Sequence, residues 1–218
     1  MLKLTAADGH SFDAFEAGDI NAPRALVVVQ EIFGVNAHIR AVSERLAGFG
    51  YRVLAPALFD RVQRGVELGY DAPGIEQGRA IRDGVTEAQA LQDIEATAAA
   101  FGGRPVGIIG YCWGGTLAWA AACKTDKFWA ASAWYGAGIA AQKDLTPTCP
   151  AQLHFGEIDH SIPLTDIEAI RAAQPGLDVF VYEGAQHGFG CEARASYSRK
   201  DWELAELRSL TLFAEHLR

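Results

Sequence analysis

A cysteine lies between two glycines in a short pattern that could support nucleophilic chemistry. Residues 110–114 read Gly-Tyr-Cys-Trp-Gly, so Cys112 has a glycine two positions away on each side. A nucleophile on a sharp strand-to-helix turn needs such glycines, because side chains there would collide with neighbouring backbone. The turn would also place the sulfur at the N-terminus of a helix, where the helix dipole stabilises a thiolate. The alternative interpretation is a small buried cysteine in a glycine-rich turn.

An aspartate and a histidine follow Cys112 in the order that a nucleophile, acid and base would need. Asp159 comes in a loop after an apolar segment, with Glu157 as a nearby competitor for the same role. Of the six histidines, only His187 has the right chain order and also follows a strand-like segment. We expect His187 to take the proton from Cys112 and Asp159 to hold the imidazole in the useful tautomer. The alternatives are an Asp159 that only caps a loop or helix and a His187 exposed on the surface.

Backbone N–H groups are expected to stabilise the oxyanion that forms when such a nucleophile attacks a carbonyl group. The residue after the nucleophile supplies one donor in this arrangement, which here is Trp113. The second donor should follow the first long apolar segment, residues 25–29, and Ile32 is the candidate.

Short apolar segments alternate with amphipathic ones, and this alternation predicts the elements that position these residues. A β-hairpin is expected around Asp8-Gly9. Strands are predicted at residues 25–29, 52–55, 105–109, 129–134, 151–155 and 179–182, and helices at 36–49, 75–101, after Trp113, and at 197–217. Such alternation favours an α/β fold with a mostly parallel, doubly wound sheet, which binds ligands at the carboxyl ends of its strands. Residues 58–74 are the longest irregular stretch and are a candidate cover for the site.

Composition limits the class of protein. The 218 residues suit a single domain, and 50% of them are hydrophobic. A formal net charge of −8 argues against nucleic-acid binding. We expect a cytoplasmic protein without a membrane contact, because no secretory signal and no apolar run of the ~20 residues that a span needs are visible. The four cysteines are widely spaced and predict neither a disulfide framework nor a metal set, so no metal and no cofactor are expected. The oligomeric state stays open, and a monomer is compatible with the sequence.

These motifs together resemble the dienelactone hydrolase family of the α/β-hydrolase superfamily, from Leu2 to Leu217. The resemblance lies in residues 30–36 (Gln-Glu-Ile-Phe-Gly-Val-Asn), 67–70 (Glu-Leu-Gly-Tyr) and 110–115, and in the loops around Asp159 and His187. It implies an α/β-hydrolase fold with an N-terminal antiparallel hairpin, and a Cys-Asp-His triad that opens the enol-lactone ring of dienelactones through an acyl-enzyme. It also implies that Glu31 hydrogen-bonds the resting thiol until substrate displaces it.

The sequence departs from the family at a position that binds the substrate. The resemblance implies arginines that hold a substrate carboxylate, one of them four residues after the histidine, where this chain has Cys191. Arg79, Arg61 and Arg194 are the candidates for this role, and a solvated surface position is the alternative for each. The main prediction is a hydrolase of a small ester or lactone. A thioesterase or other acyl hydrolase, and a thiol-sensing or binding protein without turnover, are the alternatives.

Overall fold

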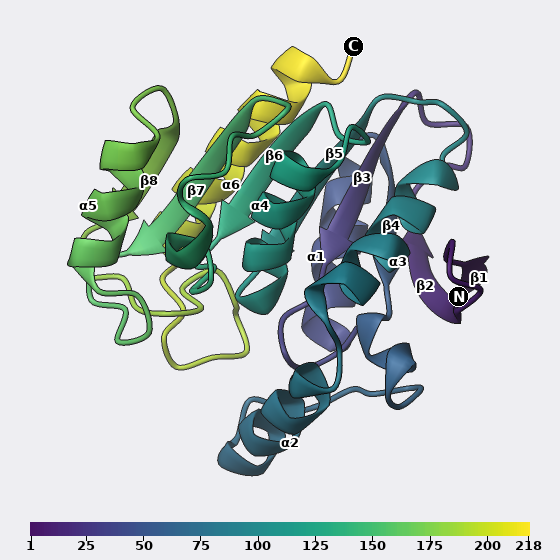
Figure 1. Ribbon diagram of the computed structural model, residues 1–218, viewed down its shortest axis with the longest axis horizontal. Helices are drawn as coiled ribbons and strands as arrows, with labels where there is room; N and C mark the ends of the chain where they lie inside the picture. The colour runs from purple at the N-terminus through teal and green to yellow at the C-terminus, as the bar shows by residue number, and fades with distance from the viewer.

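Eight strands form one mixed sheet in the computed structural model, which describes all 218 residues (Figure 1). The strands are β1 (Leu2–Thr5), β2 (Ser11–Ala17), β3 (Arg24–Val29), β4 (Tyr51–Pro56), β5 (Val106–Tyr111), β6 (Ala130–Trp134), β7 (Ala151–Gly156) and β8 (Asp178–Tyr182). Their order across the sheet is β1-β2-β4-β3-β5-β6-β7-β8. The β1–β2 and β2–β4 pairs are antiparallel and all other pairs are parallel, which confirms the predicted sheet and its N-terminal hairpin.

Helices cover both faces of this sheet. They are α1 (Ala37–Gly48), α2 (Ala72–Asp83), α3 (Glu87–Ala99), α4 (Trp113–Lys124), α5 (Leu164–Ala173) and α6 (Arg199–His216), with short 3-10 helices at Leu58–Arg61 and Ala140–Gln142. In Figure 1, α1 and α6 lie behind the sheet, and α3, α4 and α5 lie in front of it. No helix combines the length and apolarity that crossing a membrane would require.

The central strands owe their position to their apolar side chains. From Ala25 to Val29, every residue of β3 is fully buried, as expected for a strand with helices on both faces. Most of the buried hydrophobic residues form one cluster of 52 that extends from Ala17 to Leu217. This core fixes the carboxyl ends of β3, β5, β7 and β8, from which the candidate site residues follow.

One predicted helix is in fact two. The prediction of a single helix at residues 75–101 is wrong, because α2 ends at Asp83 and α3 begins at Glu87. Thr86 accepts a hydrogen bond from the Gln89 N–H, and the Gln89 side chain accepts one from the Thr86 N–H, so a capping box starts a new helix here. The stretch at 58–74 is not wholly irregular either, since it contains a 3-10 helix and the start of α2. The helix α2 itself stands at the carboxyl end of the sheet, at the bottom of Figure 1.

Candidate active site

The turn between β5 and α4 holds Cys112 in a backbone conformation that residues other than glycine rarely adopt. Its φ is 56° and its ψ is −117°. A Cβ atom on Gly110 would lie 1.9 Å from the Gly114 carbonyl oxygen, and one on Gly114 would lie 2.3 Å from the Val29 carbonyl oxygen. The crowding that the two glycines were expected to relieve is therefore present.

Cys112, His187 and Asp159 form a hydrogen-bonded series although they come from three distant loops. His187 Nε2 lies 3.2 Å from Cys112 Sγ, and His187 Nδ1 lies 2.7 Å from Asp159 Oδ2. Asp159 also accepts a hydrogen bond of 2.8 Å from the Ser161 N–H, and its side chain is fully buried. The hydroxyl of Ser196 donates to the His187 carbonyl oxygen at 2.7 Å and restrains that loop. Glu157, the competitor of Asp159, instead accepts from the Gly184 N–H.

The electrostatics of this series favour a protonated imidazole. Burial by itself lowers the pKa of His187, but the hydrogen bonds with Asp159 and Cys112 outweigh burial and raise the pKa to about 10. An imidazolium beside a thiol favours the thiolate form of that thiol. The arrangement can therefore supply a sulfur nucleophile and a proton donor at the same place.

Both candidate oxyanion donors lie next to this series. Trp113 is the first residue of α4, so its N–H has no acceptor within the helix. The N–H of Ile32, in the loop after β3, donates to no other group of the protein. Gly78 of α2 packs directly on this loop, because a Cβ atom there would lie 2.0 Å from the Ile32 carbonyl oxygen.

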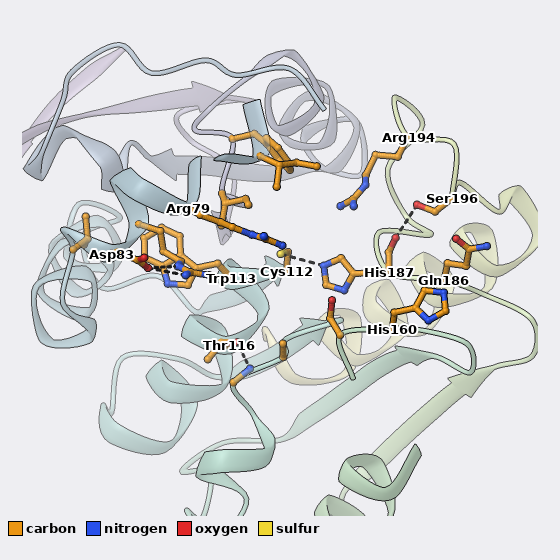
Figure 2. A pocket seen from close by; sticks show the side chains of 18 residues that line it. Arg79, Asp83, Cys112, Trp113, Thr116, His160, Gln186, His187, Arg194 and Ser196 are labelled. Atoms are coloured by element: carbon orange, nitrogen blue, oxygen red, sulfur yellow. Dashed lines mark hydrogen bonds and ion pairs between the residues drawn. The ribbon is translucent and has the colours of Figure 1, made fainter. Parts of the chain in front are cut away.

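A cavity of about 650 Å³ opens over Cys112 (Figure 2). It is lined by Ile32, Phe33, Ile75, Arg79, Arg82, Asp83, Val85, Cys112, Trp113, Thr116, Ala137, Gly138, His160, Ser161, Gln186, His187, Arg194 and Ser196. One side of the cavity is formed by α2 and by Val85, which follows it. No residue of the 58–74 stretch is in the lining, so the prediction that this stretch covers the site is wrong, and residues 75–85 line the cavity instead.

Two of the three arginine candidates line this cavity. Arg79 reaches it from α2 and has no acidic partner, whereas Arg194 reaches it from the loop after β8 (Figure 2). Arg82 also lines the cavity, but its guanidinium pairs with Asp83. The third candidate, Arg61, does not line it. Its guanidinium is buried in ion pairs with Asp8 and Asp93, both at 2.7 Å, so the structure gives it a structural position and not a substrate contact.

Glu31 is buried beside the cavity, but its partners differ from those that the family resemblance implies. Tyr70 donates a hydrogen bond of 2.9 Å to Glu31 Oε2, and Arg194 Nη1 lies 3.5 Å from Glu31 Oε1. The thiol of Cys112 has its hydrogen bond with His187 and none with Glu31. In this conformation the carboxylate is held away from the thiol by a tyrosine and an arginine.

Sequence reasoning missed one side chain that packs against the base. Tyr135 follows β6, has a φ of 38° and is fully buried. Its ring centroid lies 5.2 Å from that of His187 in an edge-on contact, and its hydroxyl has no partner within the protein. The only available signal was its position directly after a predicted strand, which does not single out a tyrosine.

Comparisons with known proteins agree with this geometry. The model of the dienelactone hydrolase family matches residues 12–217. A Synechocystis protein provisionally named carboxymethylenebutenolidase is 42% identical over an alignment of 194 positions, which covers 79% of this chain and 78% of that protein. The carboxymethylenebutenolidase of Pseudomonas putida is 32% identical over an alignment of 227 positions, which covers 98% of this chain and 95% of that protein.

A solved structure extends the likeness to three dimensions. The crystal structure of a provisionally named dienelactone hydrolase from Klebsiella pneumoniae superposes with a TM-score of 0.80 at 31% identity and covers 98% of both chains. The family model reaches from β2 to the end of α6, and the crystal structure covers nearly the whole chain. The chain therefore belongs to the dienelactone hydrolase family and is a hydrolase that acts on ester or lactone bonds.

Proposed function

We propose that the protein hydrolyses a small lactone or ester that carries a carboxylate, with dienelactone-type enol lactones as the first candidates. The observation that carries this proposal is the hydrogen-bonded series of Cys112, His187 and Asp159 in a cavity that also contains arginines. The relatives named carboxymethylenebutenolidase support the choice of substrate class.

In the first half of the reaction, the Cys112 thiolate attacks the carbonyl carbon of the substrate. The oxyanion that forms accepts hydrogen bonds from the Trp113 and Ile32 N–H groups. Collapse of this intermediate breaks the ester C–O bond, and His187 donates its proton to the leaving oxygen. The products are a thioester on Cys112 and a free hydroxyl or enol group, which in a lactone stays attached to the acyl chain.

In the second half, water hydrolyses the thioester. The now neutral His187 takes a proton from the water as it attacks the thioester carbonyl carbon, and the same N–H groups hold the second oxyanion. Expulsion of the Cys112 thiolate releases the carboxylic acid and restores the imidazolium–thiolate pair. Asp159 stays ionised throughout and orients the imidazole.

The arginines would recognise the substrate carboxylate. Arg79 has no acidic partner, so its charge is available, whereas Arg194 faces Glu31. A substrate carboxylate at Arg194 would compete with Glu31, and a displaced Glu31 could then take part in generating the thiolate. This gives Glu31 a role that depends on substrate and is compatible with its resting partners.

The deciding experiment compares a dienelactone with p-nitrophenyl acetate for wild type, Cys112→Ala and Cys112→Ser. We expect Cys112→Ala to lower kcat/KM for both substrates by about 10⁴-fold or more. Cys112→Ser should retain only slight activity, because an alkoxide is harder to generate than a thiolate. Undiminished turnover by Cys112→Ala in a correctly folded protein would refute the nucleophile assignment.

The carboxylate preference has its own test in Arg79→Gln. Loss of one charge-assisted hydrogen bond should raise KM for the dienelactone by about tenfold and leave KM for the neutral ester unchanged. Arg24→Gln, at the amino end of β3 and outside the cavity lining, is the matched control and should change neither value. An equal effect of Arg79→Gln on both substrates would contradict recognition of a carboxylate.

A further inference from the structure

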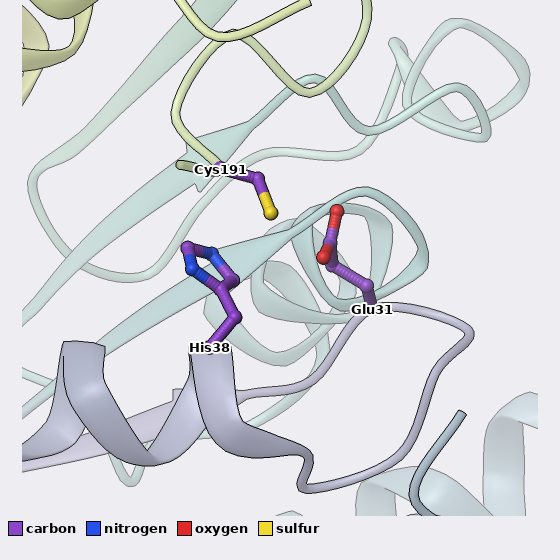
Figure 3. A group of neighbouring side chains, drawn as sticks. All are labelled: Glu31, His38 and Cys191. Carbon is purple, nitrogen blue, oxygen red and sulfur yellow. The ribbon is translucent and has the colours of Figure 1, made fainter. Parts of the chain in front are cut away.

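Three side chains next to the cavity carry a set of atoms that metal ions prefer, and the reaction proposed above uses only one of them. Glu31 lies in the loop after β3, His38 in the first turn of α1, and Cys191 in the loop after β8 (Figure 3). One carboxylate oxygen, one imidazole nitrogen and one sulfur of these residues all lie within 4.8 Å of one another. This group was not predictable from the sequence, because Cys191 lies 153 positions after His38.

We propose that Glu31, His38 and Cys191 form a binding site for a thiophilic divalent ion, with Zn²⁺ as the best fit. Zinc is bound by cysteine sulfur at about 2.3 Å, by histidine nitrogen at about 2.0 Å and by carboxylate oxygen at about 2.0–2.2 Å, in tetrahedral geometry. These bond lengths place neighbouring ligand atoms roughly 3.3–3.6 Å apart. Side-chain rotations that move the three ligand atoms by about 1 Å would bring them to that spacing. Water would then take the fourth position.

His38 supplies an independent observation that points to a ligand. Its Nε2 atom is shielded from solvent and has no hydrogen-bond partner within the protein. A buried ring nitrogen without a partner costs free energy, and a metal ion would satisfy it.

The cysteine also suits a site that forms only with metal. Cys191 is fully buried, and its sulfur lies within 4.8 Å of the Glu31 and His38 ligand atoms. Binding forms one S–Zn bond and releases the thiol proton to solvent, and the ring nitrogen of His38 binds through its lone pair. The charges of Zn²⁺, one thiolate and one carboxylate then sum to zero, so the Arg194 guanidinium loses its counter-charge.

Arg194 connects this site to the substrate cavity. Its guanidinium lies 3.5 Å from Glu31 Oε1 and would repel a divalent ion bound to that carboxylate. Zinc binding therefore requires Arg194 to turn away from Glu31 and takes Glu31 away from both Arg194 and Tyr70. Because Arg194 lines the cavity, occupancy of the metal site should reversibly change activity towards carboxylate-bearing substrates.

The test is metal binding in a Cys112→Ala background, which removes the other thiol–imidazole pair that zinc could bind. Titration of this protein with Co²⁺ should produce the absorption of a thiolate–Co²⁺ bond, which Zn²⁺ then abolishes by displacement. Adding Cys191→Ser should eliminate the absorption and weaken Zn²⁺ affinity by at least about 100-fold, since loss of an outer partner alone costs 10–100-fold. Adding Cys123→Ser instead is the matched control and should leave binding unchanged.

Two further variants keep the test decisive if Cys191→Ser does not fold. His38→Gln should retain the thiolate absorption but weaken binding, and Arg194→Gln should strengthen it because a repelling charge is lost. The proposal is overturned if Cys112→Ala shows no thiolate–Co²⁺ absorption, or if the absorption persists after Cys191→Ser. Hydrolysis of esters by the wild type without metal is a separate measurement, so failure of this site leaves the proposed reaction untouched.

Discussion

The imidazole of His187 illustrates how neighbouring charges decide the state of a single residue. With a pKa raised to about 10, against burial that opposes protonation, it carries a proton over most of the range in which proteins are stable. Because the folded pKa is higher than the unfolded value of about 6.5, the pairing stabilises the fold fully below pH 6.5. This contribution is lost as the pH rises towards 10.

We therefore expect the His187 ring signals to titrate far above pH 6.5 in an NMR experiment on histidine-labelled wild type. Asp159→Asn keeps the shape of the side chain but removes its charge. Burial, which lowers the pKa of His187, is then opposed less strongly, so the pKa of His187 should fall. His187→Gln identifies the signals among those of the six histidines. The same His187 pKa in wild type and Asp159→Asn would show that the carboxylate is not the cause.

Residue types in chain order were enough to select Cys112, Asp159 and His187, because parallel strands bring their carboxyl ends to one edge. The structure places these three in contact, and their catalytic roles stay predictions. The hydrogen-bond partners of Glu31 could not be predicted from the sequence. Tyr70 and Arg194 lie 39 and 163 positions away, and such contacts depend on how loops fold over the sheet.

At the scale of elements, the first turn of α4 has no room for an extra atom at Gly114. A Cβ atom on Gly114 would lie 2.3 Å from the Val29 carbonyl oxygen and 2.5 Å from that of Gln30, and neither can move without shifting β3. We expect Gly114→Ala to lower the free energy of unfolding by about 3 kcal/mol, as overpacking in a tight core does. Denaturant unfolding measures this loss.

The control is Gly176→Ala, at an exposed turn where a Cβ atom would meet nothing within 4 Å. This variant should unfold at nearly the same denaturant concentration as wild type. Equal stability of the two variants would contradict the steric account of the turn.

Strands were predictable where a short apolar run ends at polar or turn-forming residues. Helix boundaries were less predictable in the alanine-rich region at residues 75–101. There the helical pattern continues through Gly84, and the break depends on the capping pair Thr86 and Gln89. A Thr-x-x-Gln pattern is a recognised start signal for a helix. The local signal was thus present, but the helix propensity of the flanking residues concealed it.

At the scale of the whole molecule, Arg61 joins three segments that are distant in the chain. It pairs with Asp8 in the N-terminal hairpin and with Asp93 in α3, and Asp93 is fully buried. Sequence alone offered Arg61 as a substrate ligand because nothing in the chain marks which carboxylates will surround it. Its position instead predicts an effect on stability.

Arg61→Met should lower the free energy of unfolding by about 3–5 kcal/mol, because it leaves a buried carboxylate without a counter-charge. The double variant Arg61→Met/Asp93→Leu should recover part of the loss, since both charges are then absent. Arg199→Met, which breaks an exposed pair with Glu203, should change little. A raised KM with unchanged stability in Arg61→Met would contradict this structural role and indicate that Arg61 binds the substrate.

The packing of α2 has a consequence for how new specificities arise in this scaffold. Gly78 fixes the helix to the loop of Ile32, whereas Ile75, Arg79 and Arg82 line the cavity from the same helix. Mutations at these three positions can alter which acids fit while the turn that carries Cys112 is left intact. We expect natural or laboratory evolution of substrate range to proceed through this one exposed helix, with Gly78 as the position that must not vary.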